Sequence, residues 1–230
     1  MNALLEFDRN ATLALNGSDS LFWDNLMVTV TDTWSWTLII IALFFVIFRN
    51  NAVREALIIV LMMGLMILVA DRLCSGLVKP LVGRWRPTQD PQIMYMMDVV
   101  NNYRGGSFGF FSGHACNTFC MATFLALLFR NYLMTAVLFF WCFTTTFTRL
   151  YLGVHYLGDV TVGLAVGIVI GMLFHFLTKK ILKRFNVRGR LSSIGYTPTG
   201  YRIYDIHVLL AVIFFNYILI SIIAVGKGVA

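Results

Sequence analysis

Three polar clusters interrupt an otherwise apolar sequence, and their residue types are those that handle phosphate. The first cluster is KPLVGRWRP at 79–87, the second is FSGH at 111–114, and the third is TRLYLGVHYLGD at 148–159. Together they supply lysine, arginine, histidine, serine and aspartate, which can bind an anion and attack it. A basic residue beside an apolar run is usually an interfacial anchor. Anchors have no reason to collect with fixed internal spacings, so the joint occurrence indicates chemistry.

The basic members of these clusters can form a pocket for an anion. Lys79, Arg86 and Arg149 supply positive charge, and the two arginines offer forked donors that match phosphate oxygens. Ser112 and Gly113 stand at a predicted helix start, where a hydroxyl and free backbone N–H groups add to the positive end of the helix dipole. These five residues are the predicted phosphate-binding groups.

The histidines of the second and third clusters can carry the reaction itself. His155 and Asp159 are four residues apart, so on a helix they share a face and the carboxylate can hold the imidazole in one tautomer. Such an imidazole is a nucleophile for phosphorus, and His114 could protonate the leaving oxygen. Taken alone, the His155–Asp159 pair could also be a structural hydrogen bond or half of a metal site. No nucleotide-binding G-x-x-x-x-G-K-[ST] loop occurs in the sequence.

The composition requires these clusters to be positioned by membrane helices. Hydrophobic residues make up 59% of the 230 residues and charged residues 13%, against about 45–50% and 25% in soluble domains. A mean hydropathy of +0.77 excludes both a soluble globule and a disordered chain. The net charge of +7 is then typical of basic cytoplasmic loops, so no nucleic-acid partner is expected. The four cysteines lie in or beside apolar runs, which predicts buried thiols.

The fold class predicted from the apolar runs is an all-α, polytopic membrane protein with a bundle of six transmembrane helices. A span needs about 20 residues, and the six candidate spans are 27–48, 56–78, 114–129, 132–150, 156–177 and 206–225. Residues 3–15 read as an amphipathic helix lying at the membrane interface and ended by Asn16-Gly17. Residues 1–230 are expected to form a single membrane-embedded domain, with the signature clusters inside 79–159.

Six spans place all three clusters on one face of the membrane. The opposite face receives ten of the 18 basic residues, six of them within Lys179–Arg190 directly after a span. Such a segment stays in the cytoplasm, which predicts that both termini and the three clusters are outside. For a bacterial chain this corresponds to the inner (cytoplasmic) membrane with the site facing the periplasm.

The three clusters together resemble the signature of the type 2 phosphatidic acid phosphatase superfamily, which comprises membrane lipid phosphate phosphatases and soluble vanadium haloperoxidases. The matching residues are Lys79-x6-Arg86-Pro87, Ser112-Gly113-His114 and Arg149-x5-His155-x3-Asp159. Two positions depart from the family pattern. Phe111 stands where Pro is usual and Thr148 where Ser is usual, and neither is a proposed catalytic group.

The resemblance implies a role for each matching position. His155 would attack phosphorus and form a phosphohistidine, Asp159 would orient it, and His114 would act as general acid and then assist water. The five phosphate-binding groups would hold the phosphate oxygens. No metal and no cofactor are expected, because cationic side chains would perform the charge stabilisation. Six further polar residues are expected to be structural, at the rim, or without a role in the reaction: Arg84, Asp71, Arg72, Arg104, His175 and His207.

The expected substrate is a lipid phosphate or pyrophosphate whose tail stays in the bilayer, without an obligatory protein partner. Undecaprenyl diphosphate and lipid A are favoured, with phosphatidylglycerol phosphate or phosphatidic acid as the alternative. Residues 88–110 form the longest connection on the site face, and we expect them to act as a lid or headgroup-selecting wall, with Gly105-Gly106 giving mobility.

Two other function classes use the same residues. A non-catalytic binder or transporter could hold an anionic headgroup in the basic pocket, although binding alone does not require His114, His155 and Asp159 together. An intramembrane serine protease could use Ser112 with His155. That class wants Gly two residues before the serine, where this chain has Phe110, and it leaves the three cations unexplained.

Overall fold

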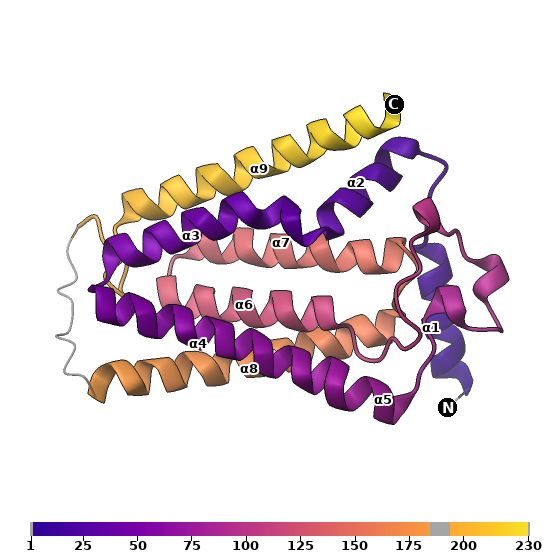
Figure 1. Ribbon diagram of the computed structural model, residues 1–230, viewed down its shortest axis with the longest axis horizontal. Coiled ribbons are helices and arrows are strands. Elements are labelled where there is room, and N and C mark those ends of the chain that lie inside the picture. Colours follow the sequence, from indigo (N-terminus) through magenta and orange to yellow (C-terminus); the bar gives the residue numbers. More distant parts are fainter. Residues whose placement is uncertain (1, 185–193, 230) are drawn as a thin grey trace.

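The long helices lie side by side along one axis of the molecule (Figure 1). The computed structural model describes residues 2–184 and 194–229, in which all regular elements are helical and the only bridges are two isolated pairs. The α-helices are α1 (Asn2–Ala14), α2 (Leu21–Thr31), α3 (Thr37–Asn50), α4 (Val53–Asp71), α5 (Lys79–Val82), α6 (Gly113–Phe129), α7 (Tyr132–Tyr151), α8 (Leu157–Arg184) and α9 (Ile203–Val229). The predicted all-α class is therefore confirmed.

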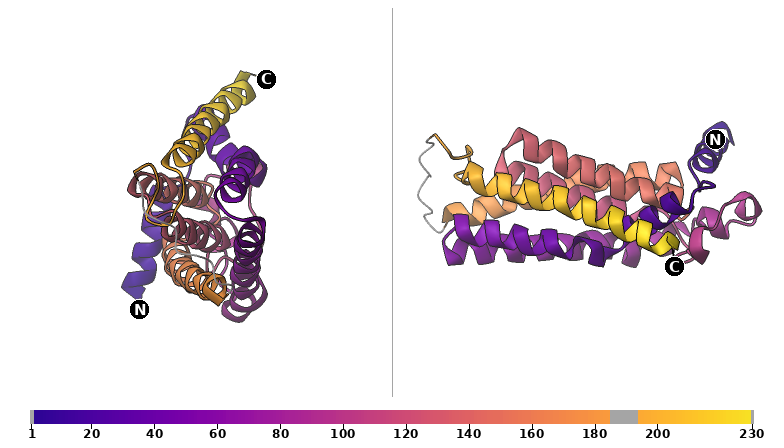
Figure 2. Two further views of the ribbon diagram at one scale, coloured as in Figure 1. Left: turned by 90° about the vertical axis from the view of Figure 1, so that its left-hand side faces the viewer. Right: turned by 90° about the horizontal axis from the view of Figure 1, so that it is seen from above.

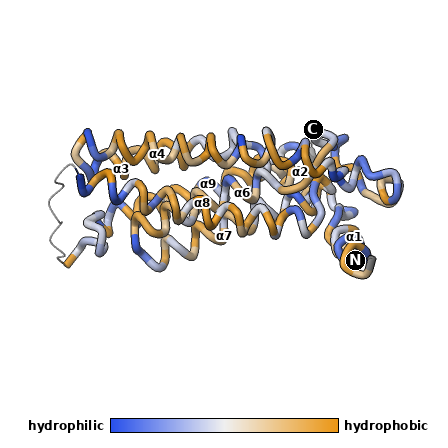
Figure 3. Tube along the Cα trace, turned by 90° about the horizontal axis from the view of Figure 1, so that it is seen from below, coloured by the Kyte–Doolittle hydropathy of each residue, from blue (hydrophilic) through white to orange (hydrophobic). Residues whose placement is uncertain are grey.

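Five helical segments in the described residues are long and apolar enough to cross a membrane. They are Thr33–Asn50, Val53–Val82, Tyr132–Tyr151, Leu157–Arg184 and Ile203–Lys227. The central helix α6 has 17 residues, or about 25 Å at 1.5 Å per residue, which is shorter than the ~30 Å hydrocarbon layer. Figure 3 shows apolar residues dominating the middle of the bundle and hydrophilic residues gathering toward its two ends.

The first predicted span, 27–48, is wrong as a continuous helix. It breaks at Asp32, whose carboxylate accepts a hydrogen bond from the N–H of Trp34 at 3.1 Å and starts a 3₁₀ turn, Thr33–Trp36. A side chain that caps a new turn competes with the helix that precedes it. The apolar run therefore forms two helices, α2 and α3, which meet at an angle (Figure 1).

The second predicted span, 56–78, extends at both ends. The helix α4 continues through a π-helical turn at Arg72–Val78 into the short helix α5, so Lys79 lies inside the helical segment and not after it. The fifth and sixth predicted spans are also longer in the structure, because α8 runs to Arg184 and α9 from Ile203 to Val229.

The helix α1 lies across one end of the bundle, which we call the site end (Figure 1). The predicted N-terminal helix is confirmed and runs from Asn2 to Ala14, and the chain turns at Gly17, where φ is +64°. The location of α1 at the membrane interface stays a prediction. A Cβ atom on Gly17 would lie 2.2 Å from Oδ2 of Asp98, so close approach as well as φ requires glycine there. Figure 2 shows that the C-terminus of α9 also lies toward the site end.

Three glycines of α8 allow its backbone to touch α6. A Cβ atom on Gly163, Gly167 or Gly171 would lie 2.5–2.6 Å from a backbone oxygen of the facing strip of chain that leads into and along α6. Small residues at such spacing let membrane helices approach closely. The glycine stripe therefore sets how near the start of α8 comes to the start of α6, where two of the sequence clusters lie.

Residues 194–202 close the opposite end of the bundle. The Thr199 hydroxyl donates a hydrogen bond to the last carbonyl of α6, at Phe129, and the Tyr201 ring packs edge-on against the Phe129 ring at 4.9 Å. Of the predicted cytoplasmic basic segment, Lys179–Arg184 ends α8, whereas Arg188 and Arg190 lie outside the described residues.

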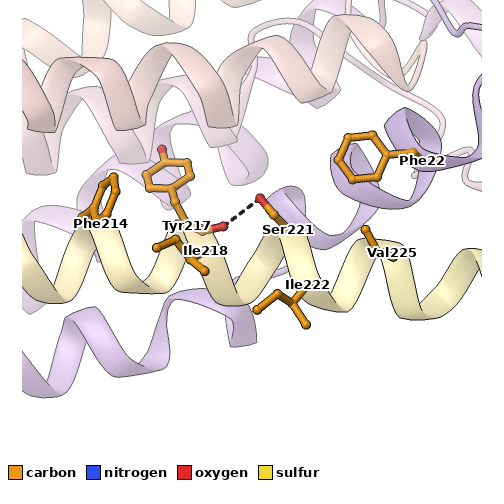
Figure 4. A pocket seen from close by; sticks show the side chains of 7 residues that line it. All are labelled: Phe22, Phe214, Tyr217, Ile218, Ser221, Ile222 and Val225. Atoms are coloured by element: carbon orange, nitrogen blue, oxygen red, sulfur yellow. Dashed lines mark hydrogen bonds between the residues drawn. The ribbon is translucent and has the colours of Figure 1, made fainter.

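The four cysteines are buried free thiols, as predicted. A separate hollow of about 480 Å³ lies between α2 and α9 (Figure 4). It is lined by Phe22, Phe214, Tyr217, Ile218, Ser221, Ile222 and Val225. No predicted site residue reaches it, and its lining holds no charged side chain, so it is not a candidate for phosphate chemistry.

Candidate active site

The three sequence clusters meet at the site end. The first leaves α5, the second begins α6, and the third joins α7 to α8. Two contacts between clusters fix the arrangement. The Ser112 N–H donates to the Asp159 carbonyl at 2.9 Å, and the Arg86 guanidinium donates to the Val154 carbonyl at 3.4 Å. Residues up to 80 positions apart thus form one site.

The predicted nucleophile lies in a buried turn. His155 is 1% exposed and Asp159 is 0% exposed, and His155 Nδ1 lies 3.5 Å from Asp159 Oδ2. His155 precedes the first residue of α8, so the expectation that both residues share a helix face is corrected. Asp159 instead caps the helix start by accepting the Tyr156 N–H at 3.1 Å. The same oxygen faces His155 Nδ1, which has no hydrogen-bond partner within residues 2–184 and 194–229.

The surroundings of His155 keep its imidazole neutral. Burial lowers the pKa of His155 well below 6.5, and the positive charges of Arg149, Arg86 and Lys79 lower it further. A neutral imidazole has a free lone pair. With Nδ1 directed toward the carboxylate, Nε2 is the nitrogen left to attack an electrophile.

Arg149 is the most deeply buried of the three cations, at 2% exposure. Its Nη1 donates to the Thr31 hydroxyl at 2.6 Å and to the Tyr103 hydroxyl at 3.1 Å. Its Nε has no partner among the described residues. A buried guanidinium held only by neutral groups is costly unless an anion joins it.

Arg86 and Lys79 complete the cationic group. Arg86 is 8% exposed, and its Nε donates to the Phe108 carbonyl at 3.2 Å. Burial lowers the pKa of Arg86, and the neighbouring Arg149 lowers it further. Lys79 is partly buried, and its Nζ is 3.9 Å from the point where a Cβ on Gly113 would be. In the described part of the chain, no ion pair to a carboxylate is formed by these three cations. Their combined charge favours binding of an anion.

The second cluster contributes a helix start and a histidine. The Ser112 hydroxyl accepts the Ala115 N–H at 3.4 Å and so caps α6, and Ser112 is fully buried. Gly113 is the first residue of the helix. His114 keeps an exposed surface at the mouth of the site, but partial burial of the imidazole and the charges of Arg149, His155 and Lys79 lower its pKa to about 3. Ser112, Gly113 and His114 thus lie at the helix start, as the sequence predicts. The Ser112 hydroxyl already has a structural role as the cap of α6.

Arg84, which the sequence predicts to be structural or at the rim, contacts Asp159 in the structure. Its Nη1 donates to Asp159 Oδ1 at 2.8 Å, and its guanidinium stacks on the Tyr156 ring with Cζ 4.0 Å from the centroid. Burial alone would lower its pKa, but Asp159 and Asp8 raise it. The available signal was its place in the first cluster, two residues before Arg86.

Two glycines give the site its close contacts. A Cβ on Gly109 would lie 2.8 Å from Asp159 Oδ2. A Cβ on Gly105, where φ is +67°, would lie 2.5 Å from Arg86 Nη1. Both glycines therefore let the 88–110 connection lie directly over the site. Close packing against Arg86 explains why position 105 is a glycine. Mobility of the Gly105-Gly106 pair stays a prediction.

The 88–110 connection is held to the bundle at several points. Asp90 accepts a hydrogen bond from the Tyr156 hydroxyl at 2.7 Å, and the Asp98 N–H donates to the Asn16 side chain at 2.7 Å. Tyr103 contacts Arg149 as described above. The connection therefore forms one wall of the site. Its role as a lid or headgroup selector remains a prediction.

The two departures from the family pattern lie beside the site. Phe111 is buried, and its carbonyl accepts a hydrogen bond from the Cys74 thiol. The Thr148 hydroxyl donates to the Thr145 carbonyl at 2.7 Å within α7. The Thr148 hydroxyl is therefore already engaged, and the Phe111 side chain has no polar group that could bind phosphate. Among the described residues, no group of three or more His, Cys, Asp or Glu side chains gathers as a metal-ligand set.

Comparison with known proteins finds a matching family and similar bacterial proteins. The model of the PAP2 superfamily matches residues 55–183. The lipid A 4′-phosphatase of Bacteroides thetaiotaomicron is 38% identical over 182 residues, covering 79% of this chain and 81% of that protein. The lipid A 4′-phosphatase of Porphyromonas gingivalis is 35% identical over 182 residues, covering 79% and 76%.

Two solved structures share the fold. The transmembrane PAP2-type phosphatidylglycerolphosphate phosphatase of Bacillus subtilis superposes with a TM-score of 0.59 at 22% identity, covering 79% of this chain and 89% of that chain. The LpxE structure from Aquifex aeolicus superposes with a TM-score of 0.52 at 22% identity, covering 74% and 93%.

Proposed function

The chain belongs to the PAP2 superfamily and is a membrane-embedded bacterial lipid phosphatase, and we propose that it removes the 4′-phosphate of lipid A. The substrate follows from the shared name of the two relatives, each at least 35% identical across about four fifths of this chain. The observation that supports the chemistry is a buried, neutral His155 that faces three cations without acidic partners.

In the first half of the reaction, His155 Nε2 attacks phosphorus. Its lone pair forms the P–N bond while the bond from phosphorus to the sugar oxygen breaks. His114, which takes up a proton from solvent once the anionic substrate offsets the charge of the three cations, gives that proton to the sugar oxygen. The ring that carries the phosphoryl group is positively charged, and Asp159 beside Nδ1 stabilises that charge. Lys79, Arg86 and Arg149, with the Gly113 N–H, bind the phosphoryl oxygens.

In the second half, water completes the hydrolysis. His114 takes a proton from the attacking water, the P–O bond forms, and the P–N bond breaks to return neutral His155 and free phosphate. The exposed position of His114 at the mouth allows proton exchange with solvent. The three cations supply the charge stabilisation that a metal gives elsewhere, so we propose metal-independent turnover.

We assign the site to the periplasmic face of the inner membrane. The basic residues at the opposite end, among them Arg49, Arg130 and Lys179, favour the cytoplasm for that end. The first cluster itself carries exposed apolar side chains, Leu81 and Trp85. They suit a substrate whose acyl chains remain in lipid while its phosphate enters the site.

The test is phosphate release by the purified protein in detergent with EDTA. Bisphosphorylated lipid A is compared with undecaprenyl diphosphate, phosphatidylglycerol phosphate and phosphatidic acid, and fragment mass spectrometry locates the phosphate lost. We expect release from the 4′ position of lipid A, and none with His155→Ala. Preference for another lipid would contradict the proposal that lipid A is the substrate. Binding of lipid A by the wild type without turnover would contradict enzymatic activity and favour a non-catalytic binder.

A further inference from the structure

The N-terminal helix α1 is connected to the proposed nucleophile by a chain of charged contacts. Arg84 bridges two carboxylates, with Nη1 at 2.8 Å from Asp159 Oδ1 and Nη2 at 2.6 Å from Asp8 Oδ2. Asp8 comes from the middle of α1 and is 8% exposed. The other oxygen of Asp159 faces His155. The order of charges is therefore Asp8, Arg84, Asp159 and then the imidazole.

The same helix also caps the helix that carries Asp159. Asp8 Oδ1 accepts the Gly158 N–H at 2.7 Å, and the Thr12 hydroxyl accepts the Leu157 N–H at 3.1 Å. These are first-turn N–H groups of α8, which have no partner inside their own helix. Because α1 satisfies them, Asp8 is held in fixed register with Asp159. An amphipathic helix that served only to lie on the membrane would not need these contacts.

The charge order has a consequence for His155. Arg84 holds Asp159 in place but draws its negative charge away from the imidazole. Asp8 draws on Arg84 in turn and so leaves Asp159 more negative toward His155. At separations of a few ångströms and an effective dielectric constant near 20, such charges interact by kilocalories per mole. The charges of Arg84 and Asp8 are therefore strong enough to change the charge and orientation of the His155–Asp159 pair.

We infer that Asp8 and Arg84 are positioning residues for the reaction, which fix the orientation and the effective charge of Asp159 toward His155. This inference rests on the roles proposed above for His155 and Asp159. It gives α1 a positioning role through Asp8, although no residue of α1 is among the proposed phosphate-binding groups.

A charge effect can be separated from mere anchoring by its sign. The acid limb of the kcat/KM profile reports protonation of the His155–Asp159 pair. Removing the positive charge of Arg84 makes that protonation easier, whereas removing the negative charge of Asp8 makes it harder. Loss of anchoring alone would not move the acid limb in opposite directions in the two variants. The other charged or titratable groups facing the pair are Arg149 from α7, Arg86 and Lys79 from the first cluster, and His114 from α6.

The experiment measures pH profiles of phosphate release for three variants. We expect the acid limb to move to higher pH in Arg84→Gln and to lower pH in Asp8→Asn, each by about one unit. We expect kcat to fall about tenfold or more in both, with little change in KM, because neither residue binds substrate. Thr12→Val is the matched control, since it removes an α1–α8 contact of the same kind without changing charge. Its profile is expected to superpose on that of the wild type.

Shifts in the same direction, no shifts, or an equal shift in Thr12→Val would overturn the inference. If Arg84→Gln does not fold, as judged by its melting temperature in detergent, the pH profile of Asp8→Asn is compared with that of Thr12→Val. A shift to lower pH in Asp8→Asn alone would then support the inference. If the wild type releases no phosphate from lipid A, the proposed substrate fails separately. The same profiles are then measured with p-nitrophenyl phosphate, which tests the positioning residues without a lipid.

Discussion

Two buried aspartates stand at opposite ends of this bundle in nearly the same setting. Asp159 lies in the first turn of α8 and Asp205 in the first turn of α9, and their exposures are 0% and 1%. Each pairs with an arginine, Asp159 with Arg84 at 2.8 Å and Asp205 with Arg49 at 3.2 Å. Burial and ion pairing alone do not distinguish the two ends.

The difference lies in what the second carboxylate oxygen faces. In Asp205 it accepts a hydrogen bond from the Asn50 side chain at 2.8 Å, and Asn50 in turn accepts the Arg202 N–H at 2.9 Å. Both carboxylate oxygens of Asp205 therefore have a side-chain partner within the protein. In Asp159 the second oxygen accepts the Tyr156 N–H at 3.1 Å and also faces His155, whose Nδ1 lacks a hydrogen bond. Beyond His155 lie cations without acidic partners. Surplus charge and incomplete hydrogen bonding mark the functional end.

The largest expected effect comes from His155. His155→Ala removes the nucleophile, so kcat should fall at least about 10³-fold. The fold should persist, because His155 lies in the turn before α8 and not within a helix of the bundle. Phosphate release and the melting temperature measured on one preparation check both statements. Residual turnover within tenfold of the wild type would contradict the assignment.

The two aspartates should respond in opposite ways to the same substitution. Asp159→Asn keeps the shape but loses the charge that stabilises a phosphorylated imidazole, so kcat should fall about 10²-fold or more. Asp205→Asn weakens a structural ion pair, so the melting temperature should fall by about 2–4 °C with kcat unchanged. If Asp205→Asn impaired kcat as severely as Asp159→Asn, the contrast between the two ends would be lost.

The arginines extend the contrast to stability. Arg149→Gln removes one of three cations that repel one another, so the ligand-free protein should melt at the same or a higher temperature while KM rises about tenfold or more. Arg49→Gln removes the partner of Asp205 and should lower the melting temperature with unchanged KM. Thermal unfolding and steady-state kinetics of both variants provide the check. A lower melting temperature for Arg149→Gln would show that repulsion among the three cations does not destabilise the ligand-free site.

The smallest effect is on the pH profile. Because burial and the three cations hold the pKa of His155 well below 6.5, the wild type should keep an unprotonated nucleophile at pH values where an ordinary histidine gains a proton. Loss of one cation in Arg149→Gln makes protonation easier, so its acid limb of kcat/KM should lie at higher pH than that of the wild type. Ionisation of the substrate is common to both profiles. Coincident limbs would show that the cations do not act on His155.

Local spacing explains which parts of the site could be predicted. The three clusters carry their residues within a few positions of one another, so their types and order were enough to predict which residues meet at one site. Contacts of long sequence separation were not accessible in this way. Thr31 and Arg149 are 118 positions apart, and Asp8 and Arg84 are 76 apart. No periodicity or motif links such pairs before the chain is folded.

The fold shows the same division. Apolar runs predicted the membrane helices because burial in lipid depends mainly on composition and length. The break at Asp32 was missed because it depends on one carboxylate capping the next turn. The extensions of α8 and α9 were missed because a helix can continue past the hydrocarbon layer on backbone hydrogen bonding alone.

The glycine stripe of α8 has a mechanical consequence. Since Gly163, Gly167 and Gly171 bring α8 against the backbone of α6, the two helices cannot slide past each other without backbone collision. We therefore expect a thicker or thinner bilayer to tilt the two helices together and to leave the spacing between the second and third clusters unchanged.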